Sequence, residues 1–169
     1  MIDLHIEFHQ QGHIKGLDTR IDKAVQLAQK EAVRALKAET ARAVSSQYWL
    51  SQALVKKHIS EQQKGILVRS ERLSLDKYKL SPKKPTRKRI LHAAVRRDGG
   101  MKSLGNRAFI WGGHPFARTS RARLPIKKLV GPAIPQLVDN DGVLELIQQK
   151  GQDTFSKRLK HYISRLGGS

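Results

Sequence analysis

Histidine side chains are the first candidates for chemistry in this chain of 169 residues. His5, His9 and His13 follow one another at intervals of four, a spacing that would place them together on one face of a helix. The same stretch, however, alternates apolar residues such as Ile2 and Leu4 with polar ones, which indicates a short strand followed by a turn. On a strand this spacing does not gather the three rings, and no group of acidic residues lies beside them. We therefore expect no metal site here.

The acidic residues that could form a catalytic pair are Asp3, Glu7, Asp18, Asp22, Glu31 and Glu39. Most of them lie on a predicted helix beside lysines and arginines, where pairing between residues four apart is the ordinary explanation. The sequence contains no GxGxxG, P-loop, HExxH or GxSxG motif. It also contains no cysteine, so a thiolate nucleophile, a thiolate metal site and a disulfide are excluded. We predict that the chain is not an enzyme and uses no cofactor.

Positive charge dominates the composition. The chain has 33 lysines and arginines against 14 aspartates and glutamates, a net charge of +19. Residues 77–138 alone contain 16 basic residues and one acid, Asp98, and so contribute +15 of that charge. Because such a local excess destabilises a compact chain by self-repulsion, it predicts a polyanion or a strongly acidic protein as partner. The alternative is a basic surface that only meets solvent.

The hydrophobic pattern predicts helices towards both ends of the chain. Small and apolar residues recur at intervals of three and four over residues 17–46, and alanine dominates this stripe, which allows close approach of another helix or a sheet. A shorter helix follows in QYWLSQALVKKHI, where Ser51 could cap it. Residues 141–166 predict a closing helix whose pattern is weakened by Gly151.

Strands are expected between these helices. In GILVRSERLSL, Ile66, Val68 and Ser70 share one face, with the imperfect alternation of a sheet edge. ILHAAVRR and RAFIWGG predict two further strands, and RDGG between them is a hairpin signal. This order predicts an α+β fold in one domain over residues 1–169. A long N-terminal helix and a C-terminal helix would pack on a small antiparallel β-sheet, with an extended proline-containing arm over about 121–138.

Two groups of basic residues are candidates for contact with DNA or with an acidic partner. One group lies in a basic loop over about 77–89 and the other ends ILHAAVRR; together they are Lys83, Lys84, Arg87, Lys88, Arg89, Arg96 and Arg97. Recognition of bases would need aromatic side chains interleaved with the basic ones. The aromatic residues are few, and Phe109 and Trp111 are expected to fill the core instead. We therefore predict that any contact with DNA is independent of base sequence.

Several segments resemble the minor tail protein Z family of tailed bacteriophages. The alanine-rich helix leads into YWLSQALVKKHI, and then GILVRSERLSLDKY, AFIWGG and RLPIKKLVGPAIPQLV follow in the order of the corresponding segments of that family. The resemblance covers residues 18–166. Its most specific elements are LPI at 124–126 and GPAIP at 131–135, whereas the N-terminal MIDLHIEFHQQ is not matched.

The resemblance implies a structural virion protein with a small α+β fold, a tail-completion or neck subunit added at the head-proximal end of the tail and needed for joining it to a filled head. It implies a homo-oligomeric ring, of six copies in a six-fold tail, between tail-terminator or tail-tube proteins and head-connector proteins around the packaged DNA. Such a protein belongs to the virion and, during assembly, to the host cytoplasm. No membrane partner is expected, because no apolar run approaches roughly 18 residues and the N-terminus is not built like a signal peptide.

The proline segment has two interpretations. As a semi-rigid arm it would dock on a neighbouring subunit through Leu124, Pro125, Ile126, Leu129, Pro132, Ile134 and Pro135. As a crossover inside the chain it would only pack the last helix. A second function also stays open on the residues alone, a sequence-independent nucleic-acid-binding protein. A nuclease is least favoured, because the basic middle offers a single acid for holding a metal.

Overall fold

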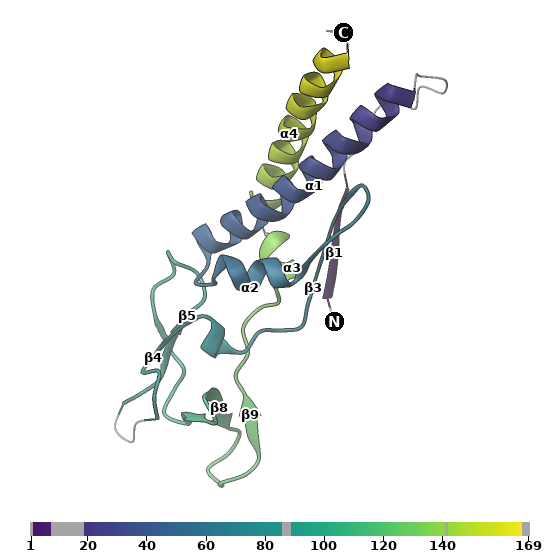
Figure 1. The fold of residues 1–169 in the computed structure, drawn as a ribbon. Helices are drawn as coiled ribbons and strands as arrows, with labels where there is room; N and C mark the ends of the chain where they lie inside the picture. Colours follow the sequence, from purple (N-terminus) through teal and green to yellow (C-terminus); the bar gives the residue numbers. More distant parts are fainter. Residues whose placement is uncertain (1, 8–18, 86–88, 141, 167–169) are drawn as a thin grey trace.

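The computed structural model of the chain describes residues 2–7, 19–85, 89–140 and 142–166. Within them the helices are α1 (Thr19–Gln47), α2 (Gln52–Lys57), α3 (Ile134–Val138) and α4 (Val143–Leu166), with a 3₁₀-helix η1 (Leu75–Lys77). The strands are β1 (Ile2–Glu7), β2 (Ile59–Glu61), β3 (Gly65–Ser70), β4 (Lys79–Ser81), β5 (His92–Ala94), β6 (Lys102–Ser103), β7 (Ala108–Trp111), β8 (His114–Arg118) and β9 (Ile126–Lys128). Figure 1 shows an elongated molecule with α1 and α4 at one end and β4, β5, β8 and β9 at the other. The two long helices packed together, with small antiparallel sheets, confirm the predicted α+β fold class.

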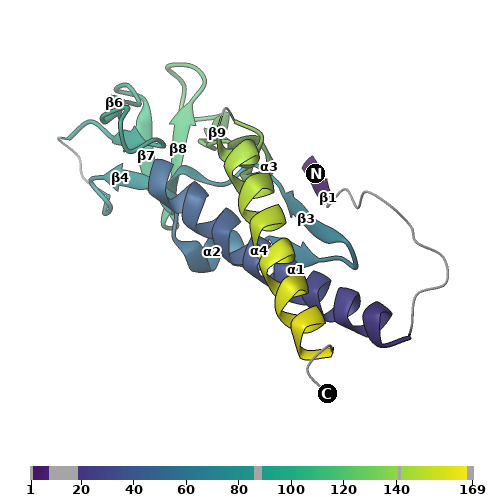
Figure 2. The ribbon, with the colours of Figure 1, turned by 90° about the horizontal axis from the view of Figure 1, so that it is seen from above.

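The two long helices lie side by side and run in opposite directions (Figures 1 and 2). Ala24, Ala28 and Ala32 form a buried stripe on α1, each no more than 4% exposed. Because an alanine side chain is a single methyl group, this stripe allows the close approach expected from the sequence. Val143 and Ile147 are buried on α4. The predicted start of α1 at residues 17 and 18 lies outside the described residues.

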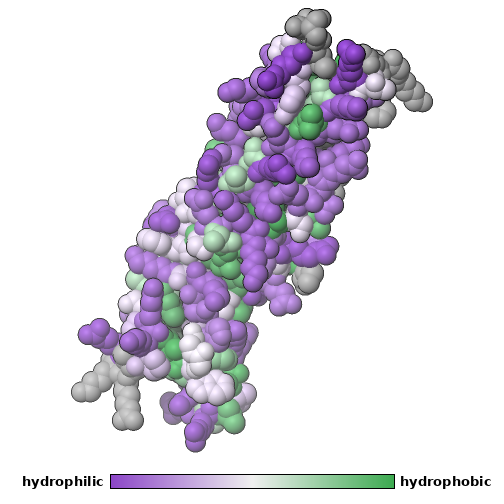
Figure 3. All heavy atoms as spheres, viewed as in Figure 1, coloured by the Kyte–Doolittle hydropathy of each residue, from purple (hydrophilic) through white to green (hydrophobic). Residues whose placement is uncertain are grey.

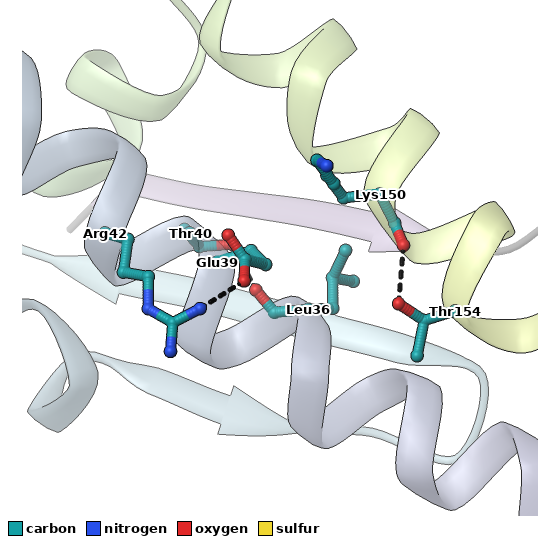
Figure 4. A network of polar contacts seen from close by, with 6 residues as sticks. All are labelled: Leu36, Glu39, Thr40, Arg42, Lys150 and Thr154. Atoms are coloured by element: carbon teal, nitrogen blue, oxygen red, sulfur yellow. Dashed lines mark hydrogen bonds and ion pairs between the residues drawn. The ribbon is translucent and has the colours of Figure 1, made fainter.

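Polar contacts add little to the pairing of these helices. Glu31 on α1 accepts a hydrogen bond from the Tyr162 hydroxyl at 2.7 Å, and its second oxygen lies 2.9 Å from Arg158 Nε. The ion pair is partly exposed, so it contributes about 1 kcal/mol or less. The contacts in Figure 4 each stay within one helix, and among them the buried Thr40 hydroxyl donates to the Leu36 carbonyl at 2.8 Å. Helix pairing therefore rests mainly on apolar burial.

β3 is the central strand of the first sheet, whose order is β1–β3–β2. Ile66, Val68 and Ser70 lie on its buried face, as their spacing predicts. The prediction of a sheet edge is wrong, because β1 pairs antiparallel along the whole of β3 and β2 pairs on its other side. The N-terminal strand, unmatched in the family resemblance, thus completes this sheet.

The remaining strands form two further three-stranded sheets, β4–β5–β6 and β7–β8–β9, where the sequence predicts a single small sheet. These strands are two to five residues long and are separated by segments rich in proline and glycine, so they pair only with near neighbours. The RDGG hairpin joins β5 to β6, with Ala93 opposite Lys102. β7 pairs instead with β8 across Gly112 and Gly113, both with positive φ, as a two-residue hairpin turn requires.

One hydrophobic core connects the helix pair to the sheets. It includes Val44 of α1, Ile66 of β3, Leu80 of β4, Ile110 of β7 and Ile147 of α4. Residues from both halves of the chain meet in it, so the sheet end is held to the helical end by apolar packing.

The proline segment runs from the sheet end into this core. Leu124 is 67% exposed at its start, whereas Ile134 is fully buried and Pro135 is buried in α3. The amide of Ile134 donates to Ser70 Oγ of β3 at 2.9 Å. The second half of the segment is therefore a crossover inside the chain. The burial of Ile134 and Pro135 corrects their assignment to a docking surface.

Gly131 is the point at which this crossover passes closest to Tyr78. A Cβ on Gly131 would lie 2.7 Å from Tyr78 Cε2, a distance that real Cβ contacts do not reach. The Tyr78 ring is buried, and its hydroxyl donates a 2.7 Å hydrogen bond to the carbonyl of Pro132. The absence of a side chain at Gly131 thus lets the ring pack against the backbone that it anchors.

Replacing Gly131 by alanine should lower the free energy of unfolding by about 1–3 kcal/mol, because the added methyl group must displace a packed ring. Denaturant unfolding measures this change. Gly99→Ala is the matched control: its Cβ would meet Arg96 Cβ at 3.6 Å, an ordinary contact, so we expect a change within about 0.5 kcal/mol. Equal losses in the two variants would contradict the role given to Gly131.

Tyr78→Phe should cost about 1 kcal/mol at neutral pH, because the Pro132 carbonyl loses its donor. Burial raises the pKa of Tyr78 above its ordinary value of 10.0, and the nearby Tyr48 adds to the rise. The folded state therefore holds the phenol proton more tightly than the unfolded state does. This contribution is complete below the ordinary pKa and is lost as the pH rises above it. Unfolding curves of the chain and the variant should converge at alkaline pH, and a constant difference would refute the assignment.

Candidate nucleic-acid interface

The basic loop predicted over about 77–89 contains β4 near its start, and its remainder belongs to the connection from β4 to β5 at the sheet end of the molecule. Lys83, Lys84 and Arg89 are exposed. Arg87 and Lys88, predicted with them, lie outside the described residues. The structure therefore places the described members of this loop at the surface, where they are accessible to a partner.

Arg96 and Arg97 are engaged by contacts within the chain. Arg97 Nε donates to the carbonyl of Ser45 at 2.9 Å, and its guanidinium lies 4.3 Å from the centre of the Trp49 ring. Arg96 Nε lies 3.1 Å from Asp98 Oδ1. Because Ser45 belongs to the last turn of α1, whose carbonyls lack helical partners, Arg97 helps to fasten the segment after β5 to the end of that helix. The structure gives these two arginines a structural role.

The β7–β8–β9 sheet has one buried face and one open face. Ile110 and Pro115 are buried on the first face. Alternation along the strands turns Phe109, Trp111 and Phe116 to the second face. Trp111 is 64% exposed, so the prediction that it fills the core is wrong, and its neighbour Ile110 takes the core position instead.

Aromatic and basic side chains share this open face. Pairing of the three strands places Phe116 between Phe109 and Lys128 in one row. The ring centres of Phe109 and Phe116 are 6.3 Å apart, and Trp111 packs edge-on against Phe116 at 5.8 Å. The guanidinium of Arg118 lies 5.7 Å from the centre of the Phe109 ring. The face thus combines aromatic surface with positive charge.

An open groove of about 550 Å³ adjoins the same face. Among the residues that the structure describes, it is lined by four arginines, Arg89, Arg107, Arg118 and Arg121, together with Phe109 and small or neutral residues, and by no acidic residue. The planar guanidinium group binds phosphate oxygens in pairs, and a concave surface of one charge concentrates its potential. The groove is therefore suited to a phosphate-bearing ligand. Figure 3 shows hydrophobic groups among hydrophilic ones over the end formed by β8 and β9.

Two acidic residues of this end, Asp76 and Asp98, are paired outside the groove, and Asp76 contacts His114, which pairs with Trp111 on the open face. The carboxylate of Asp76 lies 3.0 Å from His114 Nδ1 and 3.2 Å from Lys77 Nζ. Asp98 pairs with Arg96. Because neither carboxylate lines the groove, the charge of its four arginines is not neutralised by an acidic neighbour.

The basic residues predicted from the sequence include Arg89 but miss Arg107, Arg118 and Arg121. A signal was present in the alternation of RAFIW at 107–111 and HPFAR at 114–118. In each segment, every second residue is aromatic or basic, and the glycine pair between them is a hairpin signal. Read together, the two segments place aromatic and basic side chains on one face, the interleaving that base recognition requires.

Other kinds of site receive no support from the described residues. Among them, no three histidine, aspartate or glutamate side chains are grouped so that they could hold a metal ion. Within the same ranges, no helix combines the length and the apolar character needed to span a bilayer.

Comparisons with protein-family models, curated proteins and solved structures found no match for this chain. The resemblance to the minor tail protein Z family therefore rests on the sequence segments alone and stays a prediction.

Proposed function

We propose that the chain is a tail-completion, or neck, subunit of a tailed bacteriophage. It forms a ring at the head-proximal end of the tail and enables the tail to join a filled head around the DNA channel. The observation that carries this proposal is the separation of charge along the molecule. Residues 77–138, which build the sheet end and the crossover, hold 16 basic residues and one acid, whereas the rest of the chain holds 17 basic and 13 acidic residues.

A ring around DNA uses such an asymmetry. Duplex DNA presents one negative charge for about every 1.7 Å of its axis, so a basic end turned towards the channel is attracted to it without reading its sequence. The same charge makes the sheet ends of neighbouring subunits repel one another until a polyanion or an acidic ring lies between them. Assembly should therefore be favoured on the tail over assembly in free solution.

Ring formation also needs two different surfaces that fit each other. β1 is an edge strand that pairs on one side only within the described residues, so its other edge can pair with a neighbour. The tip of the proline segment can supply the second surface, since Leu124 and Pro125 are exposed and Ile126 is half-buried. We keep the docking interpretation of the segment for residues 124–126, whereas Leu129 and Pro132, predicted with them, are half-buried and Leu129 packs against the core.

The test is the mass of the purified chain by light scattering, alone and mixed with purified tail tubes, followed by electron microscopy of the mixture. A ring, or a cap at one end of the tubes, is the expected result. A chain that stays monomeric and ignores the tubes would overturn the proposal.

Leu124→Ala should weaken attachment to tail tubes in co-sedimentation, while the free energy of unfolding changes by less than about 0.5 kcal/mol because the side chain is exposed. Leu146→Ala is the matched control, since Leu146 is an exposed leucine of α4. Ile134→Ala should instead cost about 2–5 kcal/mol of stability, because its side chain is fully buried. Equal attachment of the two leucine variants would show that the tip is not a docking surface.

A sequence-independent nucleic-acid-binding protein is the second candidate, and the arginine groove favours it. A monomer that ignores tail tubes but binds duplex DNA, with an affinity that falls steeply as salt rises, would support this candidate over the first.

A further inference from the structure

The open face of the β7–β8–β9 sheet carries aromatic as well as basic side chains, and neutralising the phosphate charge of DNA requires only the basic ones. A surface that only meets duplex phosphates needs cations, and aromatic rings add nothing to that contact. Here the Phe116 ring lies 6.3 Å from Phe109 and 5.8 Å from Trp111, and the Trp111 side chain remains 64% exposed. A large exposed ring beside other apolar rings is typical of a binding surface.

Strand pairing sets the spacing of this surface. Residues on one face of a strand recur at about 6.6–6.8 Å, so Phe109 and Trp111 of β7 lie in line with Arg107, which directly precedes the strand. Arg118 lies across from Arg107, where its amide donates to the Arg107 carbonyl at 3.2 Å. The phenylalanine row is therefore flanked by an arginine row on one side and by Trp111 with His114 on the other.

The arginine row opens into the groove. Arg107 and Arg118 both line it, together with Arg121 and Arg89. Arg118 also lies over Phe109, so a single guanidinium joins the aromatic surface to the cationic groove. A ligand that alternates flat rings with phosphates would find a place for each.

We propose that this face binds nucleic acid with unpaired bases. Two or three bases stack on Phe109, Phe116 and Trp111, and the adjoining phosphates lie in the groove against Arg107, Arg118 and Arg121. Stacking on aromatic rings tolerates any base, because every base has a flat face. A duplex hides these faces in its own stack, so it can use only the groove.

The charge of the face disfavours two other occupants. A second copy would bring the same basic residues against these, and like charges repel. An acidic protein would satisfy the arginines but carries no regular series of flat rings for Phe109, Phe116 and Trp111. Competition by polyglutamate distinguishes this occupant from nucleic acid.

This inference specifies which form of nucleic acid the chain contacts, and it rests on the proposed function for the place of that contact in a virion. Its test uses the isolated chain, whereas the test of the proposed function uses tail tubes. Either can therefore fail while the other succeeds.

The experiment measures binding of the full chain to a labelled oligo(dT) of about twelve nucleotides, within the range of single-strand site sizes, and to a duplex of equal length. Fluorescence anisotropy gives the affinity. Tryptophan emission reports whether a base stacks on Trp111. The measurement uses the Trp49→Phe variant, which removes the other tryptophan and whose fold is checked by thermal unfolding.

Trp111→Ala should weaken oligo(dT) binding about tenfold, within the range for losing one base–aromatic stack, and leave duplex binding unchanged. Ile163→Ala, which removes an exposed apolar side chain from α4, should change neither affinity. Arg118→Gln should weaken binding to both ligands and reduce the salt slope by about one, whereas Lys160→Gln on α4 should not. Emission from Trp111 should fall when oligo(dT) is added.

Three results would overturn the proposal. The first is equal binding of oligo(dT) by the Trp111→Ala and Ile163→Ala variants. The second is duplex binding as tight as single-strand binding with unchanged Trp111 emission, which would leave charge as the sole determinant. The third is displacement of oligo(dT) by polyglutamate at equal charge concentration, which would assign the face to an acidic protein.

Discussion

The crossover from the basic sheets to the helix pair passes through the protein's own core, and its fit against Tyr78 is the constraint on which the rest of the structure depends. Gly131 leaves room for the Tyr78 ring, and the Pro132 carbonyl accepts a hydrogen bond from its hydroxyl. Ile134 is then fastened to β3 through Ser70. Because α3 is buried at this point, α4 leaves it in a position to pack along α1. GPAIP at 131–135, one of the two most specific elements of the family resemblance, is thus explained by packing.

The basic residues of the chain divide into two groups by their surroundings. Arg97 and Lys79 lie over the Trp49 ring, each 4.3 Å from its centre, and Arg158 pairs with Glu31. These cations hold elements of the fold together. The arginines of the groove instead line an open surface to which the described part of the chain contributes no acidic residue. Net charge alone therefore overstates the number of cations available to a partner, and the sheet end is where those suited to binding are concentrated.

The sequence predicts α1 and α2 well because their signals are local: an alanine stripe for α1, and Ser51, whose hydroxyl accepts from the Leu54 amide, for α2. It misses α3, which lies in the segment expected to be an extended arm. The division into three sheets could not be predicted, because strands of two to five residues carry little pattern and their partners are set by tertiary contacts. The role of Gly131 depends on Tyr78, which is remote in the sequence. The open face could have been predicted, since alternation along the strand places Trp111 and Ile110 on opposite faces. A tryptophan in an apolar strand nevertheless favours assignment to the core. The burial of α3 fits the crossover interpretation, whereas docking through the exposed tip at 124–126 stays a proposal.

The central claim is that the basic sheets face a DNA channel while the helix pair lies away from it. The measurement that tests it most directly is an electron-microscopy map of the chain assembled on tail tubes, at a resolution that separates helices from sheets. The account predicts a ring in which the β7–β8–β9 sheet and the arginine groove line the channel, with α1 and α4 outside. A ring lined by α1 and α4, with the basic sheets turned outward, would contradict it.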